Sequence, residues 1–424
     1  MSIVRHTSIT LAARYAANGA KALTALLVAT TLGTAGAGAF ALIRIWPHLA
    51  TSILGGGFTI AAPYFIAGRR YPVDAVNQTA VALGIRWGFV TYLGWAAASG
   101  FLIGRFHGEL SYEAVVLVGL CIPFLLMRNY LNSIQQGLRS FTAANISLFV
   151  EEIATLLFVV PLFWFRGPES RMLMVLASVG GAAASCLVAL IMLARDGISC
   201  RPHYHKEIAM EALPFGMKGH VGRMANMLTW RLDVLILSAF ANVEVVGLCA
   251  VAHQAAELFR PLSASLTFVL RPLIASLSLA EARVKGVMLY RRVFGLNLLM
   301  VLVMAAIGGP VIRLVFGEEF APAIPAFQIL LIGLAAHGAD GVLAGYNVGI
   351  GRPEFNTYTA LTGLVVTVVG DLLLIPPYGL IGGAVVSSVA YTVKAITFTV
   401  IFLSTSGVSF AQLCGLKQYS PDPA

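Results

Sequence analysis

Charged and polar side chains recur at helical spacing inside the apolar stretches of this chain. Arg44 and His48 are four residues apart, and Asn226 and Asp233 are seven apart. Residues at these spacings lie on one face of a helix. A guanidinium binds phosphate or carboxylate oxygens through two parallel hydrogen bonds, and a carboxylate binds a proton or a cation. The pattern predicts a polar interior that holds an anion beside balancing acids.

The elements that position these residues are predicted to be membrane-spanning helices. The 424 residues are 58% hydrophobic and 11% charged, and the mean hydropathy is +0.84. A soluble domain carries about 25% charged residues. Stretches near the length that crosses a bilayer recur throughout. We expect an all-α polytopic protein with about twelve spans, at 10–32, 38–67, 78–104, 113–136, 142–165, 172–194, 214–240, 245–278, 293–316, 322–349, 354–375 and 379–404.

The distribution of Lys and Arg predicts the orientation. Loops after odd-numbered spans hold Arg105, Arg166 and Arg171, with Arg313 at a span edge. Loops after even-numbered spans hold eleven basic residues: Arg69, Arg70, Arg139, Arg195, Arg201, Lys206, Arg283, Lys285, Arg291, Arg292 and Arg352. Cytoplasmic loops carry the excess of Lys and Arg, so both termini should be cytoplasmic. These loops and the intramembrane residues account for the net charge of +9 without a nucleic-acid partner.

Motifs for catalysis, metals or cofactors do not stand out. The five cysteines are scattered without CxxC spacing and are interpreted as small core residues without disulfides. The HYH triplet at 203–205 has no further ligand nearby, and glycine-rich phosphate loops are absent. The first apolar stretch carries Arg14 and Lys21, unlike a cleavable signal peptide. We therefore predict no catalytic residue, no metal site and no cofactor, and a protein that is not an enzyme.

The two halves of the chain resemble each other. A shift of 209 residues brings Arg14 onto Arg223, Gly38 onto Gly247, Arg44 onto His253 and Pro63 onto Pro272. Six spans in each half would give both copies the same polarity, which is a parallel repeat with its substrate site between the halves. The expected domains are a six-helix lobe at 1–194, a cytoplasmic linker at 195–213, a second six-helix lobe at 214–404 and a cytoplasmic tail at 405–424. A central cavity is expected between the two lobes.

Charged residues within the spans are the candidate site residues. A charge near the bilayer centre costs roughly 2.5–3.5 kcal/mol or more, so these residues are expected to face a cavity or a partner. Some of them should only close interhelical ion pairs or support kinks. The first half holds more positive charge than its own acids neutralise. The candidates for substrate binding are Arg14, Lys21, Arg44, Arg128, Arg223 and Arg260, and those for ion coupling or charge balance are Asp233, Glu257, Asp340 and Glu151.

Several stretches resemble bacterial polysaccharide flippases, which export O-antigen and exopolysaccharide units. The longest is TWRLDVLILSAFANVEVVGLCAVA (229–252), which resembles the seventh span of these proteins and the turn into the eighth. Cys249 stands where a tyrosine is common. Similar stretches are LGTAGAGAFAL (32–42), LVFGEEFAPAIPAFQILLIG (314–333), YNVGIGRPEFN (346–356) and DLLLIPPYGLIGGAVVSS (371–388). The superfamily also contains MATE drug exporters and lipid II flippases.

The resemblance implies a function and a location. A protein of this family would move a polyprenyl-diphosphate-linked oligosaccharide from the cytoplasmic to the outer leaflet by alternating access, for lipopolysaccharide or exopolysaccharide biosynthesis. It would lie in the bacterial cytoplasmic (inner) membrane, with a polysaccharide polymerase and glycosyltransferases as further partners. Coupling to protons or sodium ions is a further implication. The glycan, the coupling ion and the oligomeric state are not specified by the sequence.

Three alternatives stay open at this point. A MATE-type antiporter exports cations and should have an acidic or aromatic cavity, which the arginines of the first half argue against. A lipid II flippase of the same superfamily is a second alternative, which the sequence does not exclude. A membrane-embedded polysaccharide polymerase or ligase is the least favoured, because such an enzyme needs a sizeable outer loop and every predicted outer loop is short.

Overall fold

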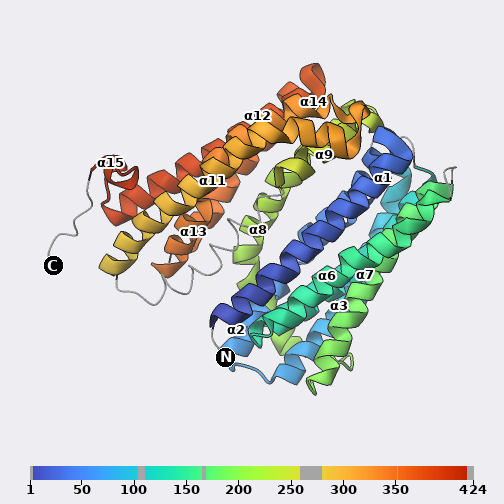
Figure 1. Ribbon diagram of the computed structural model, residues 1–424. Helices are drawn as coiled ribbons and strands as arrows, with labels where there is room; N and C mark the ends of the chain where they lie inside the picture. The colour runs from blue at the N-terminus through green and yellow to red at the C-terminus, as the bar shows by residue number, and fades with distance from the viewer. Residues whose placement is uncertain (1–2, 104–109, 165–168, 258–278, 351, 418–424) are drawn as a thin grey trace. The chain divides into compact units, whose positions relative to one another are not determined.

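The computed structural model describes residues 3–103, 110–164, 169–257, 279–350 and 352–417, and these residues form helices without any β-strand (Figure 1). Two 3-10 turns, Val160–Phe163 and Glu318–Phe320, connect longer elements. The α-helices are α1 (Ile3–Leu54), α2 (Phe58–Ala67), α3 (Val73–Leu102), α4 (Tyr112–Val118), α5 (Cys121–Gly137), α6 (Phe141–Val159), α7 (Glu169–Arg195), α8 (Lys206–Phe240), α9 (Val243–Glu257), α11 (Leu279–Phe316), α12 (Ala323–His337), α13 (Asp340–Gly349), α14 (Glu354–Ser406) and α15 (Phe410–Leu413).

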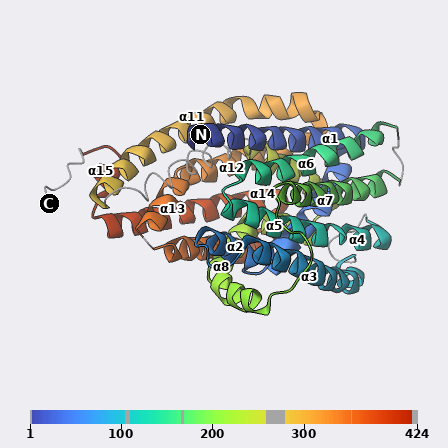
Figure 2. The same cartoon turned by 90° about the horizontal axis from the view of Figure 1, so that it is seen from below.

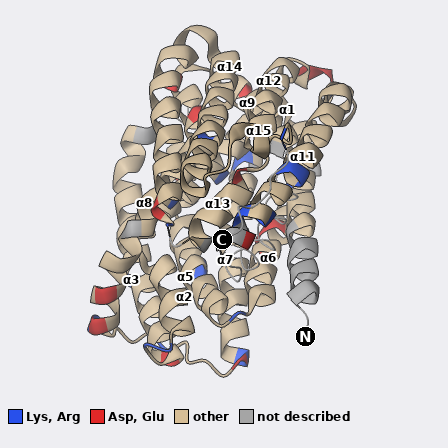
Figure 3. Ribbon diagram, turned by 90° about the vertical axis from the view of Figure 1, so that its left-hand side faces the viewer, with Lys and Arg blue, Asp and Glu red and all other residues tan. Residues whose placement is uncertain are grey.

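Seven helical segments of the described chain are long and apolar enough to cross a membrane, which confirms an all-helical membrane protein. They are Tyr15–Leu54, Tyr112–Gly137, Phe141–Leu162, Ser170–Arg195, Arg283–Phe316, Ala323–Val348 and Glu354–Ser406. Figure 3 shows acidic and basic residues on helix segments away from the loops as well as at helix ends. The arrangement of twelve spans in two six-helix lobes stays a prediction.

Two of these helices are too long for a single crossing. At 1.5 Å per residue, the 53 residues of α14 would extend about 80 Å, against about 30 Å for the hydrocarbon core. The chain reverses at Gly379 (φ 52°, ψ −127°), a conformation that requires glycine. A Cβ atom at Gly370 would lie 2.8 Å from Val386 Cγ1, so the two halves of α14 are antiparallel neighbours. The 52-residue α1 has a similar non-helical glycine, Gly33.

Three predicted spans are interrupted, which the hydrophobic pattern did not reveal. The span at 38–67 breaks at Gly55–Gly57, the span at 113–136 at Gly119–Leu120, and the span at 322–349 at Gly338–Ala339. Glycine is needed at two of these breaks because large side chains pack directly against the backbone. A Cβ atom at Gly119 would overlap the Trp95 ring, and one at Gly338 would overlap the Asn297 amide. Interrupted helices in membrane proteins are tolerated where they are buried in protein or line a cavity.

The chain divides into two compact units. The first unit comprises residues 1–227 and 241–250, and the second comprises residues 228–240 and 251–424. In the first unit, α5 contacts α1, α2, α3, α6 and α7 and so lies at its centre (Figure 2). In the second unit, α14 packs against α12 and α13. The boundary at 227/228 falls inside α8, so its two ends belong to different units.

Within the first unit, residues that the predicted repeat would relate contact each other reciprocally. A Cβ atom at Gly38 would overlap the carbonyl oxygen of Val243, and one at Gly247 would overlap the carbonyl oxygen of Thr34. Both pairs of related positions, 34 with 243 and 38 with 247, differ by the offset of 209 found in the sequence. Reciprocal contact of matching positions is typical of a two-fold axis. The close crossing of α1 and α9 therefore has two-fold character.

Candidate functional site

A buried cluster of arginines and glutamates lies within the first unit. The Arg44 guanidinium on α1 donates two hydrogen bonds to Glu152 on α6, from Nη1 to Oε2 over 2.7 Å and from Nη2 to Oε1 over 2.8 Å. This is the parallel fork that arginine forms with carboxylate or phosphate. Arg44 Nη2 also lies 3.7 Å from Glu151 Oε1. The arginine thus bridges two adjacent acids.

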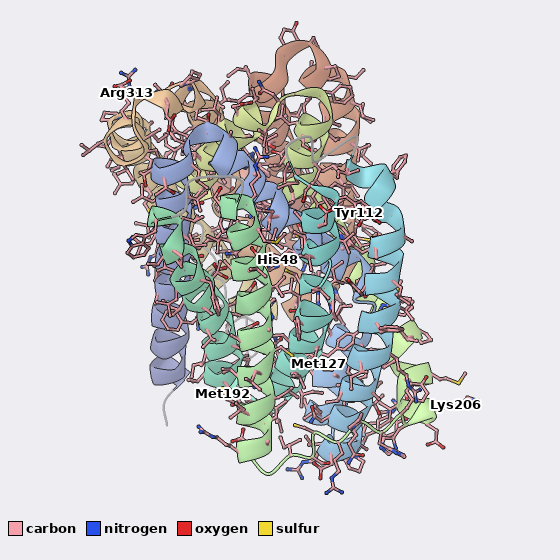
Figure 4. All side chains as sticks on the ribbon, turned by 90° about the vertical axis from the view of Figure 1, so that its right-hand side faces the viewer. His48, Tyr112, Met127, Met192, Lys206 and Arg313 are labelled. Atoms are coloured by element: carbon pink, nitrogen blue, oxygen red, sulfur yellow. The ribbon has the colours of Figure 1, made fainter. Side chains whose placement is uncertain are left out.

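Glu151 contacts three basic groups from two other helices. Arg128 on α5 donates to its Oε2, and His48 Nε2 on α1 lies 3.1 Å from its Oε1. The side chains of Arg128 and Glu151 are 5% and 6% exposed, so the pair is almost fully removed from solvent. Figure 4 labels His48 between the end of the first unit that carries Tyr112 and the end that carries Lys206. The cluster therefore lies along the helices and away from the loops.

A small cavity adjoins this cluster. Its volume is about 10 Å³, room for about one water molecule, and it is lined by Arg44, His48 and Glu151 together with apolar residues and the hydroxyl-bearing Thr155 and Ser178. The wall is completed by Ile43, Pro47, Cys121, Leu125 and Ala182. Charged groups beside such a space can be reached by a water molecule, whereas groups sealed by packed side chains cannot. This cavity makes the cluster the leading candidate for substrate contact.

The charge balance of the cluster differs from the sequence expectation. The sequence predicted that Arg44 and Arg128 would contribute unneutralised positive charge. In the structure both are paired with Glu151 or Glu152. Two arginines face two glutamates, so the formal charges of these four side chains cancel. Helical spacing identified the polar faces, but it did not show how they pair across helices.

The second unit contains a cluster of acids and histidines. Asp233 on α8 is buried, and its Oδ2 lies 2.7 Å from His253 Nε2 on α9 and accepts a hydrogen bond of 2.9 Å from Ser387 Oγ on α14. Asp371, also on α14, is fully buried and within electrostatic reach of Asp233 and His253. Among the described residues, neither carboxyl oxygen of Asp371 has a hydrogen-bond partner. Its proximity to Asp233 was not foreseen from the sequence.

Asp340 lies at another polar site of the second unit, where α12 ends and α13 begins. Its Oδ2 is 2.6 Å from Nδ1 of His337, across the interruption between the two helices. The Asn297 amide on α11 donates to the carbonyl oxygens of Leu334 and Ala335, which the interruption leaves without helical partners. Lys394 is buried, and its Nζ lies 5.9 Å from the centroid of the Trp230 ring. The contacts of His337, Asp340 and Asn297 thus stabilise the interruption between α12 and α13.

The remaining candidates are dispersed. Arg223 is exposed on α8 and donates a hydrogen bond of 2.7 Å to Thr59 Oγ1 within the first unit. Arg223 and Asp233 were predicted to share one face of a helix. They belong to different units, because Asp233 is buried in the second unit. Lys21 is half-buried on α1. Arg14 lies in α1 and Glu257 ends α9, but their side chains, like all of Arg260, are outside the described residues.

Over the described ranges, no group of three or more His, Cys, Asp or Glu side chains is arranged to hold a metal ion. The cysteines were predicted to be small core residues, and Cys121, Cys186 and Cys249 are buried, whereas Cys200 is half-buried and Cys414 is exposed.

Comparison with protein families identifies the chain's relatives. Residues 3–278, well over half of the chain, match the model of a family described as polysaccharide biosynthesis proteins. The chain belongs to this family. The family model extends across the first-unit cluster and includes Asp233 and His253. An uncharacterised membrane protein of Methanocaldococcus jannaschii is 27% identical over 210 residues, which cover 47% of this chain and 40% of that protein.

Solved structures of MOP-superfamily transporters share the fold of this family member. An inward-facing multidrug resistance MATE transporter has a TM-score of 0.75 at 16% identity, with 96% of this chain and 95% of that chain covered. The outward-facing conformation of such a transporter has a TM-score of 0.70 at 15% identity, again with 96% of this chain and 95% of that chain covered. A Pyrococcus furiosus transporter, for which a reversed polarity of the binding pocket has been described, gives 0.64 at 14% identity, covering 97% and 96%. The protein is therefore a multi-pass membrane protein with a transporter fold.

Proposed function

We propose that the protein is a flippase that moves a polyprenyl-diphosphate-linked oligosaccharide from the cytoplasmic to the outer leaflet by alternating access. Family membership supports a role in polysaccharide biosynthesis, and the fold supports transport. The observation that carries the proposal is that Arg44 and buried Arg128 both contact Glu151, beside a small cavity that Arg44 and Glu151 line. Two guanidinium forks suit the oxygens of a diphosphate, which is the constant part of such substrates.

The proposal adopts the topology predicted from the sequence. It places the chain in a bacterial cytoplasmic membrane with both termini cytoplasmic, in two six-helix lobes at 1–194 and 214–404 around a central cavity, joined by the linker 195–213 and followed by the tail 405–424. The reciprocal contact of Gly38 and Gly247 supports a parallel repeat. A polymerase and glycosyltransferases acting on the same glycan would be its functional partners.

The acids of the second unit are proposed to balance charge or couple transport to an ion. Asp233, bound by His253 and Ser387, lies close to the unpartnered carboxyl group of Asp371. A buried carboxylate without a partner is strongly disfavoured, so Asp371 would bind a proton or a cation. Asp340, Glu257 and Glu151 are further candidates for this role. Arg14, Lys21, Arg223 and Arg260 are proposed as additional substrate contacts along the pathway.

The test is transport by purified protein in liposomes that contain a polyprenyl-diphosphate-linked oligosaccharide on one leaflet. A lectin added outside reports how much glycan reaches the outer surface. The variant Arg44→Lys, combined with Arg128→Lys, keeps both charges but loses both forks, so we expect flipping to fall at least about tenfold. Arg86→Gln changes an exposed arginine of α3 outside the cluster and should flip normally. Wild-type liposomes that flip no better than empty ones would exclude the proposal.

Export of organic cations is the second candidate, because the solved structures with this fold include multidrug MATE transporters. Buried arginines disfavour a cationic substrate through like-charge repulsion. The same liposomes, loaded with a fluorescent organic cation, decide between the two. Cation efflux without glycan flipping would establish the alternative.

A further inference from the structure

The first-unit cluster is neutral, which limits how a diphosphate can bind there. Arg44 and Arg128 are matched by Glu151 and Glu152, and a diphosphate diester brings about two further negative charges. Adding the substrate to the intact cluster would place four negative charges against two arginines. In a buried site such repulsion is costly. Diphosphate binding therefore requires the two glutamates to lose their charge or leave the arginines.

Resting on the proposed function, we propose that Glu151 and Glu152 are place-holders. They occupy the positions that diphosphate oxygens take in the loaded state, and each takes up a proton from solution when the substrate displaces it. The proposal adds a proton-linked exchange to the site. It also assigns a role in substrate binding to Glu152, and a new one to Glu151.

The geometry of Arg44 shows why the exchange is possible. Its two terminal nitrogens bind the two oxygens of Glu152 at 2.7 and 2.8 Å, as they would bind two oxygens of a phosphate. The exchange therefore keeps the arginine rotamer and its bonding pattern. Glu152 is 15% exposed, more than twice the 6% of Glu151, and is the acid with better access to solvent. We expect Glu152 to be released first.

Glu151 is bound more firmly, because it contacts groups on two other helices. Arg128 and Cys121 face it from α5, and Arg44 and His48 face it from α1. On α7, Ser178 lines the adjoining cavity, and the buried thiol of Cys186 lies within electrostatic reach of Arg128. His48 is the other group here that changes charge near neutral pH. Protonation of His48 would add a positive charge and assist the same exchange.

The cavity offers neutral hydrogen-bond partners for the displaced groups. It adjoins Arg44, His48 and Glu151, and Thr155 and Ser178 offer hydroxyl groups along its wall. A protonated glutamate needs only neutral hydrogen-bond partners, which hydroxyl groups provide. The cavity itself has room for about one water molecule, so the exchange requires the surrounding helices to move apart as the diphosphate enters.

The experiment is calorimetric titration of the full chain with a farnesyl-diphosphate-linked N-acetylglucosamine. This probe is a diphosphate diester whose own charge stays constant between about pH 6 and about pH 8. Place-holder exchange predicts that wild-type affinity rises about tenfold per unit fall in pH for each proton taken up. Titration in buffers of different ionisation enthalpy counts those protons. One or two per molecule are expected.

The decisive variant is Glu151→Gln combined with Glu152→Gln, which removes the place-holder charges and keeps the side-chain shapes. Its affinity at about pH 8 should exceed that of the wild type by at least about tenfold, and its affinity should depend less on pH than that of the wild type. Glu152→Gln by itself should give a smaller increase. Glu207→Gln, on the exposed start of α8, serves as the matched control and should bind like the wild type.

Each outcome decides the proposal. Equal or weaker binding by the glutamine variants, or wild-type binding without proton uptake, would overturn the exchange while leaving the flippase function intact. If the glutamine variants do not fold, proton uptake by the wild type alone decides. A folded wild type that binds no diphosphate diester at any pH would instead contradict the proposed function.

Discussion

The two units of the chain neutralise their buried acids in different ways. In the first unit, arginines on α1 and α5 bind Glu151 and Glu152. In the second unit, Asp233 binds a histidine, His253, and a serine. Arg44 and His253 are 209 residues apart, the offset that aligns the two halves. The two positions that the predicted repeat would match thus carry an arginine in one unit and a histidine in the other.

This difference indicates a division of labour between related helices. An arginine stays charged at every physiological pH, whereas a histidine changes charge between about pH 5 and 8. A fixed charge is suited to holding an anionic group throughout a transport cycle. A titratable pair is suited to taking up and releasing a proton within the cycle. Four substitutions or pairs of substitutions test this difference, with expected effects on stability that decrease from Arg128 to Ser387.

The largest effect should follow removal of Arg128. Arg128→Met leaves Glu151 without its most buried partner, so the free energy of unfolding should fall by about 3–5 kcal/mol. Thermal unfolding in detergent and abundance in the membrane measure this loss. The double variant Arg128→Met with Glu151→Leu should regain most of the stability but no transport. A single variant as stable as the wild type would show that the ion pair is dispensable.

The second effect concerns the contact that relates the two halves. Gly38→Ala and Gly247→Ala each force a methyl group against a backbone carbonyl, which should cost about 1–3 kcal/mol. Gly94→Ala is the matched control, because nothing lies within 4 Å of its added Cβ atom, and it should be neutral or stabilising. Unequal costs at positions 38 and 247 would argue against a two-fold contact.

The third effect separates transport from stability in the second unit. Asp233→Asn keeps the shape and removes the charge that binds His253, so stability should fall by only about 1–2 kcal/mol. Flipping in liposomes should nevertheless fall at least about tenfold. Asp196→Asn, in an exposed loop, is the control and should transport normally. Normal transport by Asp233→Asn would remove the second unit from the transport cycle.

The smallest effect should come from Ser387. Its hydroxyl donates to Asp233 over 2.9 Å, but Asp233 keeps the partners His253 and the amide of Val234 when it is removed. Ser387→Ala should therefore cost about 0.5–1.5 kcal/mol. Ser404→Ala removes an exposed hydroxyl that bonds only within its own helix and should cost less. Equal thermal shifts for the two variants would mean that the serine adds nothing to the aspartate site.

Much of the fold was predictable because hydrophobic length reports membrane spans directly. The predicted boundary between 354–375 and 379–404 coincides with the reversal at Gly379, where two prolines precede a glycine. The interruptions at Gly119 and Gly338 were not predicted. A single glycine in an apolar run does not reveal that Trp95 or Asn297 will pack against it from another helix.

The candidate site was predictable by composition but not by pairing. Helical spacing placed Arg44 with His48 on one face, and the structure has both next to Glu151. Spacing along one helix cannot show which side chain of another helix it meets, so the neutralisation of Arg44 by Glu152 was missed. Arg223 and Asp233 were predicted to lie on one helix face, but they belong to different units because α8 contributes to both.

The most direct test is an electron cryomicroscopy structure of the full chain with a bound polyprenyl-diphosphate-linked sugar. The account predicts density for the diphosphate between Arg44 and Arg128, with Glu151 and Glu152 turned away from the guanidinium groups. A diphosphate bound elsewhere, with the ion pairs of Arg44 and Arg128 intact, would contradict it.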